Sequence, residues 1–234
     1  MPVSIDTVYQ RVLALANKEQ RGYITPQEFN LFANQAQMDI FEQYFYDINQ
    51  FERVPDNNTE YSDIVDLINE KLSVFKISRP QGATFNSTFQ QWTLAPNCYK
   101  LGDVFVGGEV ADEVDYNEYI RYSNSPLASP TTTYPVYVRQ DVGDLSGIEV
   151  FPTNTSNVRY TFVRRPDVVR WGYIVVNEKP LHDATSSTHF ELHAAEETKL
   201  VLKILILSGI TLNKPMLTRQ AASLDIQKIQ QEKQ

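Results

Sequence analysis

Residues 24–51 read ITPQEFNLFANQAQMDIFEQYFYDINQF, and this stretch carries the strongest helix signal in the chain. Thr25 is a suitable N-cap, Pro26 occupies the first helical position, and Glu28 completes a capping box. Apolar residues then recur with a period near 3.6, as on one face of a helix. A helix of this length spans about 40 Å. The pattern indicates a central helix that other helices, or neighbouring subunits, pack against; a long core helix of a monomer is an equally good interpretation.

The composition is that of an ordinary globular chain of 234 residues, 42% apolar and 21% charged. Its 29 acidic residues outnumber the 21 Lys and Arg, whereas a protein that wraps DNA or lies on a membrane surface is normally basic. An acidic surface can still line a path along which DNA moves, because it repels phosphates. We expect no signal peptide in MPVSIDTVYQ, no transmembrane helix, and no internal disulfide, since Cys98 is the single cysteine.

The sequence predicts helical ends and a β-rich middle. Helices are expected at 3–17, over the stretch quoted above and at 60–72, which gives an N-terminal helical region of residues 1–76. Residues 77–186 read as an inserted β-rich region, and residues 187–234 as C-terminal helices. The expected fold class is therefore α+β: a helical bundle formed by the N- and C-terminal segments, with an inserted antiparallel β domain.

Short segments of alternating polarity, separated by turn residues, fill the β-rich region. They read LSVFKIS, TFQQWTL, YKLGDVFV, YPVYVRQ, GIEVFP, NVRYTFVRRP and IVVN, and Gly107-Gly108 forms a turn after the third. A short helix, YNEYIRYS, is expected after Asp115, which can cap it together with Glu118. The spacing predicts an antiparallel sheet or a small sandwich.

Two further helices are predicted near the C-terminus. The first, at 189–208, contains LVLKILIL, is apolar on nearly all sides and is expected to pack against the central helix. The second, at 216–234, has a thin apolar stripe, so we expect an arm that becomes ordered when it docks on a partner. The residues expected at packing or interface positions are Phe29, Phe32, Ile40, Phe41, Tyr44, Phe45, Ile204, Leu217 and Leu224.

Candidate catalytic or metal-binding residues are few. His189 and His193 are spaced four apart, as two metal ligands on a helix would be, but the motif is H-F-E-L-H and His182 is the only other histidine. Histidines packed near a helix start are therefore the favoured interpretation. No phosphate-binding, dinucleotide-binding or nucleophile-elbow motif occurs, and Cys98 reads as a small apolar filler. We expect no catalytic residues, no metal and no cofactor.

Two charged clusters lie in the β-rich part of the sequence. The acidic one could hold a carboxylate pair for hydrolysis, but a solvated face plus the helix cap is the more usual role of such a run. The basic one could contact nucleic acid, although an inter-subunit salt bridge to the acidic cluster suits an acidic chain better. The clusters are Asp112, Glu113, Asp115 and Glu118, and Arg164, Arg165 and Arg170.

Several stretches, taken in order, resemble the head-to-tail connector proteins of tailed bacteriophages, most of all the adaptor or ring proteins of podovirus-type and crAss-like phages. Taken together, these stretches cover most of the chain. Besides the helix quoted above, the stretches are YKLGDVFV, DYNEYIRYSNSPLASPTTTYPVYV, IEVFPTN, VRYTFVRRPDVVRWGY and HAAEETKLVLKILILSGI.

The resemblance implies a virion structural protein at the head–tail junction, made in the host cytoplasm. It implies a homo-oligomeric ring, commonly of twelve copies, that contacts the portal protein and further tail or ring proteins. The genome would pass through this ring during ejection without sequence-specific binding, and no membrane and no enzymatic residues are implied. The alternative is another tail or neck component, such as a tail-completion protein. An intracellular enzyme with a binding fold is the third class.

Overall fold

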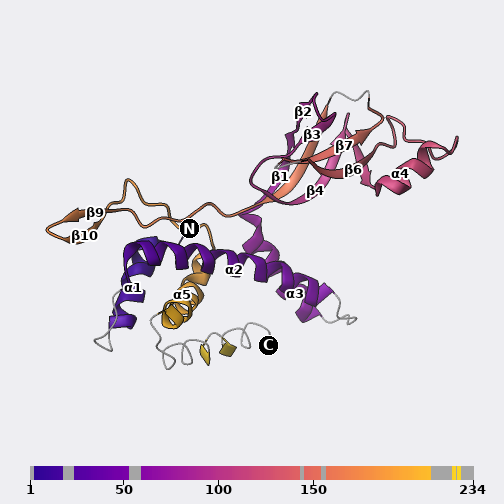
Figure 1. The fold of residues 1–234 in the computed structure, drawn as a ribbon. Coiled ribbons are helices and arrows are strands. Elements are labelled where there is room, and N and C mark those ends of the chain that lie inside the picture. Colours follow the sequence, from indigo (N-terminus) through magenta and orange to yellow (C-terminus); the bar gives the residue numbers. More distant parts are fainter. Residues whose placement is uncertain are drawn as a thin grey trace. The chain divides into compact units, whose positions relative to one another are not determined.

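The computed structural model describes residues 3–17, 24–52, 59–142, 145–153, 157–211, 223–224 and 226–227. The chain divides into two compact units (Figure 1). Unit 1 comprises Met1–Val74 and Pro166–Gln234, and unit 2 comprises Phe75–Arg165. Residues 166–186, which the sequence had assigned to the β-rich region, thus belong to unit 1. None of the helices within the described ranges combines the length and apolarity that a membrane span requires.

Unit 1 is built around the central helix, α2. In Figure 1 it lies beside α1, α3 and α5, and α5 contacts both α1 and α2, so the predicted packing of the apolar C-terminal helix on the central helix is confirmed. A two-stranded ribbon, β9–β10, also belongs to this unit. The elements are α1 (Ile5–Asn17), α2 (Pro26–Glu52), α3 (Thr59–Ser73), β9 (Tyr173–Val176), β10 (Lys179–His182), a 3-10 turn η1 (Ala194–Glu196) and α5 (Glu197–Thr211).

The start of α2 follows the capping box predicted from the sequence. The backbone N–H of Glu28 donates to the Thr25 hydroxyl at 3.3 Å, and the backbone N–H of Thr25 donates to the Glu28 carboxylate at 2.9 Å. These bonds satisfy donors that have no partner within the helix. They also lower the pKa of Glu28, because the carboxylate accepts from both the backbone and the hydroxyl of Thr25.

A row of amide side chains on α2 holds the extended segment that follows Pro166. Asn30 and Asn34 each donate to and accept from one residue of this segment, Trp171 and Val169 respectively, at 2.7–3.3 Å. Gln37 continues the row, donating to the carbonyl oxygen of Asp167 at 2.9 Å. The segment is therefore tied to the helix through backbone groups that would otherwise lack partners.

The C-terminal helix begins later than the sequence predicts. Residues 189–193 are not helical: Phe190 forms an isolated antiparallel bridge with Val3, and Phe190 and Leu192 are both buried. This burial of alternate residues suits an extended chain, so the helix starts only at η1 and α5. The predicted arm at 216–234 falls outside the described residues except for 223–224 and 226–227, which are helical.

Unit 2 is an eight-stranded curled sheet. Its strand order is β1-β8-β4-β5-β6-β7-β3-β2, and all neighbours are antiparallel except β5 and β6, which are parallel. Inward-facing residues of β4, β6, β7 and β8 form its core. The strands are β1 (Lys76–Gly82), β2 (Thr84–Asn86), β3 (Gln91–Thr93), β4 (Cys98–Val106), β5 (Glu109–Glu113), β6 (Val136–Val142), β7 (Leu145–Phe151) and β8 (Val158–Arg164).

The expected fold class, a helical bundle carrying an inserted antiparallel β domain, is wrong. The sheet is large and mixed, and a fifth helix, α4 (Tyr116–Ser123), belongs to unit 2 rather than to a terminal bundle. The physical reason is the parallel pairing of β5 with β6, in which Asp112 lies opposite Val136 and Glu113 opposite Tyr137. Parallel strands require a long crossover connection, and α4 with residues 124–135 supplies it.

Candidate interaction surface

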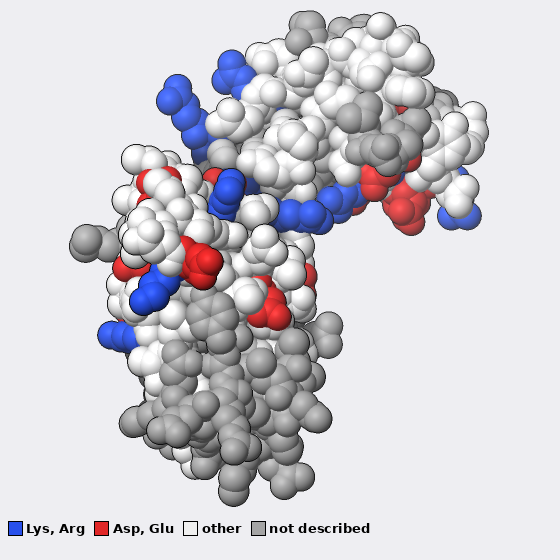
Figure 2. Space-filling model, turned by 60° about the vertical axis from the view of Figure 1, so that its left-hand side comes forward, with Lys and Arg blue, Asp and Glu red and all other residues white. Residues whose placement is uncertain are grey.

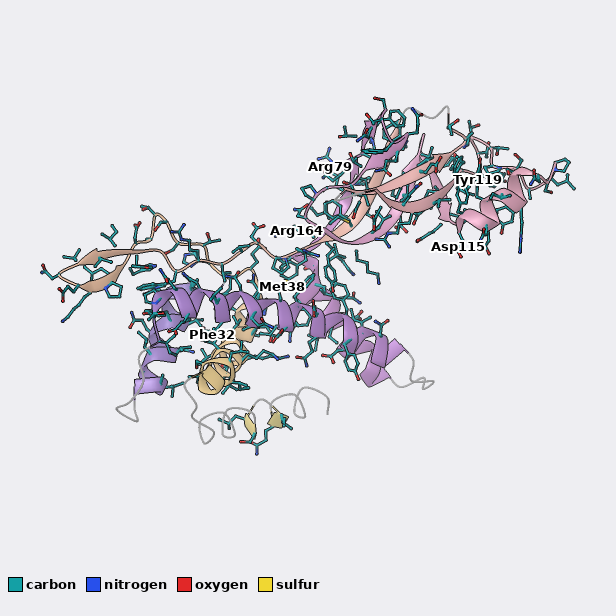
Figure 3. All side chains as sticks on the ribbon, in the orientation of Figure 1. Phe32, Met38, Arg79, Asp115, Tyr119 and Arg164 are labelled. Carbon is teal, nitrogen blue, oxygen red and sulfur yellow. The ribbon has the colours of Figure 1, made fainter. Side chains whose placement is uncertain are left out.

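The residues predicted at packing or interface positions mostly build the interior of unit 1. Phe32 and Phe45 are half-buried, Leu224 is exposed, and Leu217 lies outside the described residues. In Figure 3, Phe32 and Met38 both lie on α2. The buried members of the set are Phe29, Ile40, Phe41, Tyr44 and Ile204. These buried side chains are therefore not available to a partner, and any docking surface consists of other residues.

The histidines and the cysteine have local structural roles. His189 Nδ1 accepts from the backbone N–H of Ile5 at 3.3 Å, and His193 Nδ1 accepts from that of Ala195 at 3.3 Å as the N-cap of η1. Cys98 packs against the core of unit 2, as predicted, and burial raises its pKa, which disfavours the reactive thiolate. Among the described residues, no three His, Cys, Asp or Glu side chains gather as metal ligands would.

The crossover helix α4 has none of its residues buried. Tyr119 of this helix contacts the sheet: its ring stacks on Phe151 with centroids 3.6 Å apart and planes 15° from parallel. Tyr119 also lies against the small cluster of Val114, Val138 and Phe151. A crossover helix normally buries an apolar stripe on its sheet, whereas α4 buries none of its residues.

Large apolar side chains are exposed on and after α4. Leu127 is completely exposed and Tyr134 is 78% exposed, both in the connection between α4 and β6. With carboxylates of β5 and α4, this connection also lines a hollow in the surface. We define the α4 patch as the exposed apolar residues Tyr116, Ile120, Tyr122, Leu127 and Tyr134 together with the acidic residues Asp112, Glu113, Asp115 and Glu118.

The acidic residues of the α4 patch are exposed, and no ion pair within the described ranges joins them to a base. Asp115 is the N-cap residue of α4, as predicted, but its side chain makes no capping hydrogen bond. Glu113 accepts from the phenol of Tyr137 at 3.1 Å; burial and this carboxylate both raise the pKa of Tyr137. In Figure 2, acidic side chains form a group on unit 2.

Most basic residues of unit 2 lie on or beside β1, β4 and β8, whereas Arg139 lies on β6 and the exposed Arg121 lies on α4 itself. Figure 3 places Arg79 on β1 and Arg164 at the end of β8, and Asp115 and Tyr119 at the α4 end of the unit. Arg165 follows β8, and its guanidinium lies 6.0 Å from the ring of Tyr99. The basic residues carried by or directly following β1, β4 and β8 are Lys76, Arg79, Lys100, Arg159, Arg164 and Arg165. Successive side chains of a strand alternate between the two faces of the sheet, so Arg159 and Arg164 face opposite sides of β8. The other basic residue of the predicted cluster, Arg170, belongs to unit 1.

A second apolar surface lies on the β9–β10 ribbon of unit 1. Asn177 and Glu178 join its strands in a tight turn with φ of 49° and 64°. Such two-stranded ribbons are marginal in water unless they pack on something. Its exposed apolar residues are Ile174, Val175, Val176 and Leu181.

The sequence analysis quoted the α4 segment and the β9 segment IVVN, but not β10, and assigned none of their apolar residues to an interface. The available signal was the composition of residues 116–134, which carry four tyrosines and an isolated leucine around proline and serine. Aromatic residues are enriched at protein interfaces. No protein-family model matches the chain, and no curated protein matches it in sequence.

Proposed function

We propose that this chain is a non-enzymatic structural subunit of a bacteriophage head-to-tail connector, a ring beneath the portal through which the genome passes. The observation that carries the proposal is the α4 patch. It lies in the segment DYNEYIRYSNSPLASPTTTYPVYV, which is also one of the stretches that resemble connector proteins. A structural subunit requires surfaces that neighbours cover, and this segment exposes aromatic and aliphatic side chains to solvent.

The charge balance supports a subunit that surrounds DNA without holding it. The chain has a net charge of −8, so its average field repels phosphates. Unit 2 carries basic residues on or beside β1, β4 and β8 as well as the acidic group of the α4 patch. Tight DNA binding would instead require a basic groove.

Electron microscopy and native mass measurement of the purified protein, with and without portal-bearing heads, test this function. The expected result is a ring of uniform copy number that joins the heads at the portal vertex. A protein that joins heads only after another neck protein has bound would favour a tail-completion role. A protein that neither forms rings nor joins heads or tails would contradict the connector function.

A further inference from the structure

We propose that the free edge of β9 pairs with the same edge of a second copy, so that two β9–β10 ribbons join into one four-stranded antiparallel sheet. The contact belongs to unit 1, goes beyond the connector function and does not require it. The ribbon supplies three features that favour this pairing: an unpaired backbone along one edge, an edge sequence without protection, and a pattern of donors and acceptors that matches itself.

The backbone of β9 has unpaired groups on the side away from β10. The N–H of Asp183 donates to the carbonyl oxygen of Gly172 at 2.9 Å, which marks that pair as hydrogen-bonded. Hydrogen-bonded and non-hydrogen-bonded pairs alternate in an antiparallel ribbon, so Tyr173 and Val175 occupy non-hydrogen-bonded pairs. Val175 lies opposite Pro180, which has no N–H to donate, as such a pair allows. The N–H and C=O groups of Tyr173 and Val175 therefore point outward, and among the described residues none forms a hydrogen bond with them.

The edge of β9 lacks the features that keep the other strand edges of this chain from pairing. The two sheets have four edge strands, β1, β2, β9 and β10. The first carries Lys76, Arg79 and Pro80, the second has only three residues, and β10 carries Lys179 and Pro180. Charges, proline and short length are common means by which proteins prevent edge-to-edge association. By contrast, β9 reads YIVV and has neither a proline nor a charge.

The strand that matches this edge is β9 of a second copy. When two antiparallel copies of β9 meet about a two-fold axis at Ile174, Tyr173 of each copy lies opposite Val175 of the other. Each of these two pairs exchanges two hydrogen bonds, so the outward N–H and C=O groups of both residues obtain partners. No other edge strand in the described ranges is both four residues long and free of proline and charge. An uncharged strand also meets its own copy without like-charge repulsion.

Pairing also covers apolar side chains that the ribbon exposes. Ile174, Val176 and Leu181 lie on one face of the ribbon and are 46–58% exposed. Tyr173, on the opposite face, stacks on the buried ring of Trp171, with centroids 5.8 Å apart. In the paired ribbons Ile174 contacts Ile174 of the second copy across the axis, which removes apolar area from water. A two-stranded ribbon alone is marginal in water, whereas three or more strands with an apolar face are stable.

The proposed contact is isologous, because both copies use the same edge. A pair of copies therefore has no free β9 edge left, and the outer edges of its sheet are the two β10 strands with their prolines. We expect the contact to produce a dimer rather than a filament. The α4 patch belongs to unit 2 and takes no part in it.

Disulfide cross-linking of the whole chain tests the register, with Cys98→Ser as the background because Cys98 is the single cysteine. Ile174 faces its counterpart in a non-hydrogen-bonded pair with Cα atoms about 4.5 Å apart, so Ile174→Cys should give disulfide-linked dimers under mild oxidation. Leu181→Cys is the matched control, since Leu181 lies on the same face and is 54% exposed against 58% for Ile174. Its Cα would lie about 15 Å from its counterpart, beyond the reach of a disulfide.

Sedimentation velocity of variants without added cysteine tests the strength of the contact. Val175→Pro removes an outward N–H, as Pro180 does on β10, and Ile174→Lys places two like charges across the axis. Each variant should weaken dimerisation by about tenfold or more. Leu181→Lys is the control and should leave the dissociation constant within about threefold of the wild type, because its charges lie about 15 Å apart and are screened at about 0.15 M salt.

Circular dichroism must show the wild-type melting temperature for these variants; if Val175→Pro lowers it, Ile174→Lys alone decides. A dimer that persists in Ile174→Lys, or equal cross-linking of the two cysteine variants, would overturn the pairing. A wild-type protein that stays monomeric at its highest soluble concentration would also overturn it. These outcomes leave the connector function standing, because joining to portal-bearing heads tests that function separately.

Discussion

The side-chain amide of Asn34 exchanges two hydrogen bonds with the backbone of Val169. Asn34 Nδ2 donates to the carbonyl oxygen of Val169, and the backbone N–H of Val169 donates to Asn34 Oδ1, both at 2.9 Å. Asn30 repeats the arrangement with Trp171. Four residues of helix advance about 6 Å, and two residues of extended chain advance about 6.6 Å. A helix can therefore place amides in register with alternate residues of an extended segment.

Replacing Asn34 with alanine should destabilise unit 1. Val169 is buried, so its N–H and C=O would lose their partners without gaining water. We expect the free energy of unfolding to fall by about 1–3 kcal/mol, measured by urea denaturation. Asn49→Ala is the control on the same helix, because Asn49 is exposed and its side-chain amide donates to the carbonyl oxygen of Phe45 one turn earlier. The control should change the free energy by less than about 0.5 kcal/mol; equal losses in both variants would contradict the role of the amide row.

The sequence predicted where α2 starts, but it did not predict that the polar face of α2 binds another segment of the chain. Thr25, Pro26 and Glu28 are local signals, and the capping box forms within four residues of chain. Asn30, Asn34 and Gln37 recur at helical spacing just as apolar residues do, yet polar residues on one face usually indicate solvent. Their partners lie more than a hundred residues away in sequence, so no local pattern reveals them.

The mixed sheet, too, could not be predicted from local sequence patterns. The strand β5 has the sequence EVADE, in which only Ala111 is buried, so it lacks the alternation that predicts a strand. Without β5 the remaining strands read as antiparallel, and α4 reads as a surface helix rather than a crossover. The apolar residues of the α4 patch were likewise missed, because their exposure depends on how little α4 packs on the sheet.

The capping box at Thr25 should make the stability of unit 1 depend on pH. The folded pKa of Glu28 is lowered, so its contribution is present above the ordinary glutamate pKa and is lost as pH falls through the folded value. In thermal melts at neutral pH, Glu28→Ala should lower the melting temperature by about 2–4 °C. The difference from wild type should shrink in acid below the folded pKa. Glu28→Gln does not titrate, so its difference from wild type should change with pH as that of Glu28→Ala does, but its offset at neutral pH should be smaller because the amide can keep the bond. An offset for Glu28→Ala that stays constant with pH would contradict the linkage.

The core position Ile204 on α5 should be sensitive to truncation. Its side chain is completely buried in unit 1, in a helix that contacts α1 and α2. Ile204→Ala should lower the free energy of unfolding by about 2–5 kcal/mol through lost burial and a residual cavity, and Ile204→Asp should leave the protein insoluble. Leu31→Ala is the control, because Leu31 on α2 is 71% exposed. A soluble Ile204→Asp variant with an unchanged melting temperature would contradict the assigned packing.

The ion pair between Lys71 and Glu196 joins α3 to η1. Lys71 Nζ lies 2.6 Å from Glu196 Oε1, and the two side chains are 25% and 1% exposed. Lys71→Met removes the base and leaves the glutamate carboxylate buried beside an apolar side chain. Since removing one partner of a buried ion pair takes away a charge that stabilises the carboxylate where water is excluded, the free energy of unfolding should fall by about 3–5 kcal/mol in urea denaturation.

Two further variants separate the charge effect from lost packing in this ion pair. Adding Glu196→Gln to Lys71→Met removes the buried charge, so part of the stability should return. Arg11→Met breaks a more exposed ion pair of unit 1, in which Arg11 lies 2.8 Å from Glu197 but its side chain is 55% exposed. That loss should be at most about 1 kcal/mol, because water screens an exposed pair. If the double variant is no more stable than Lys71→Met alone, the loss comes from packing of the lysine chain rather than from the lost charge of the ion pair.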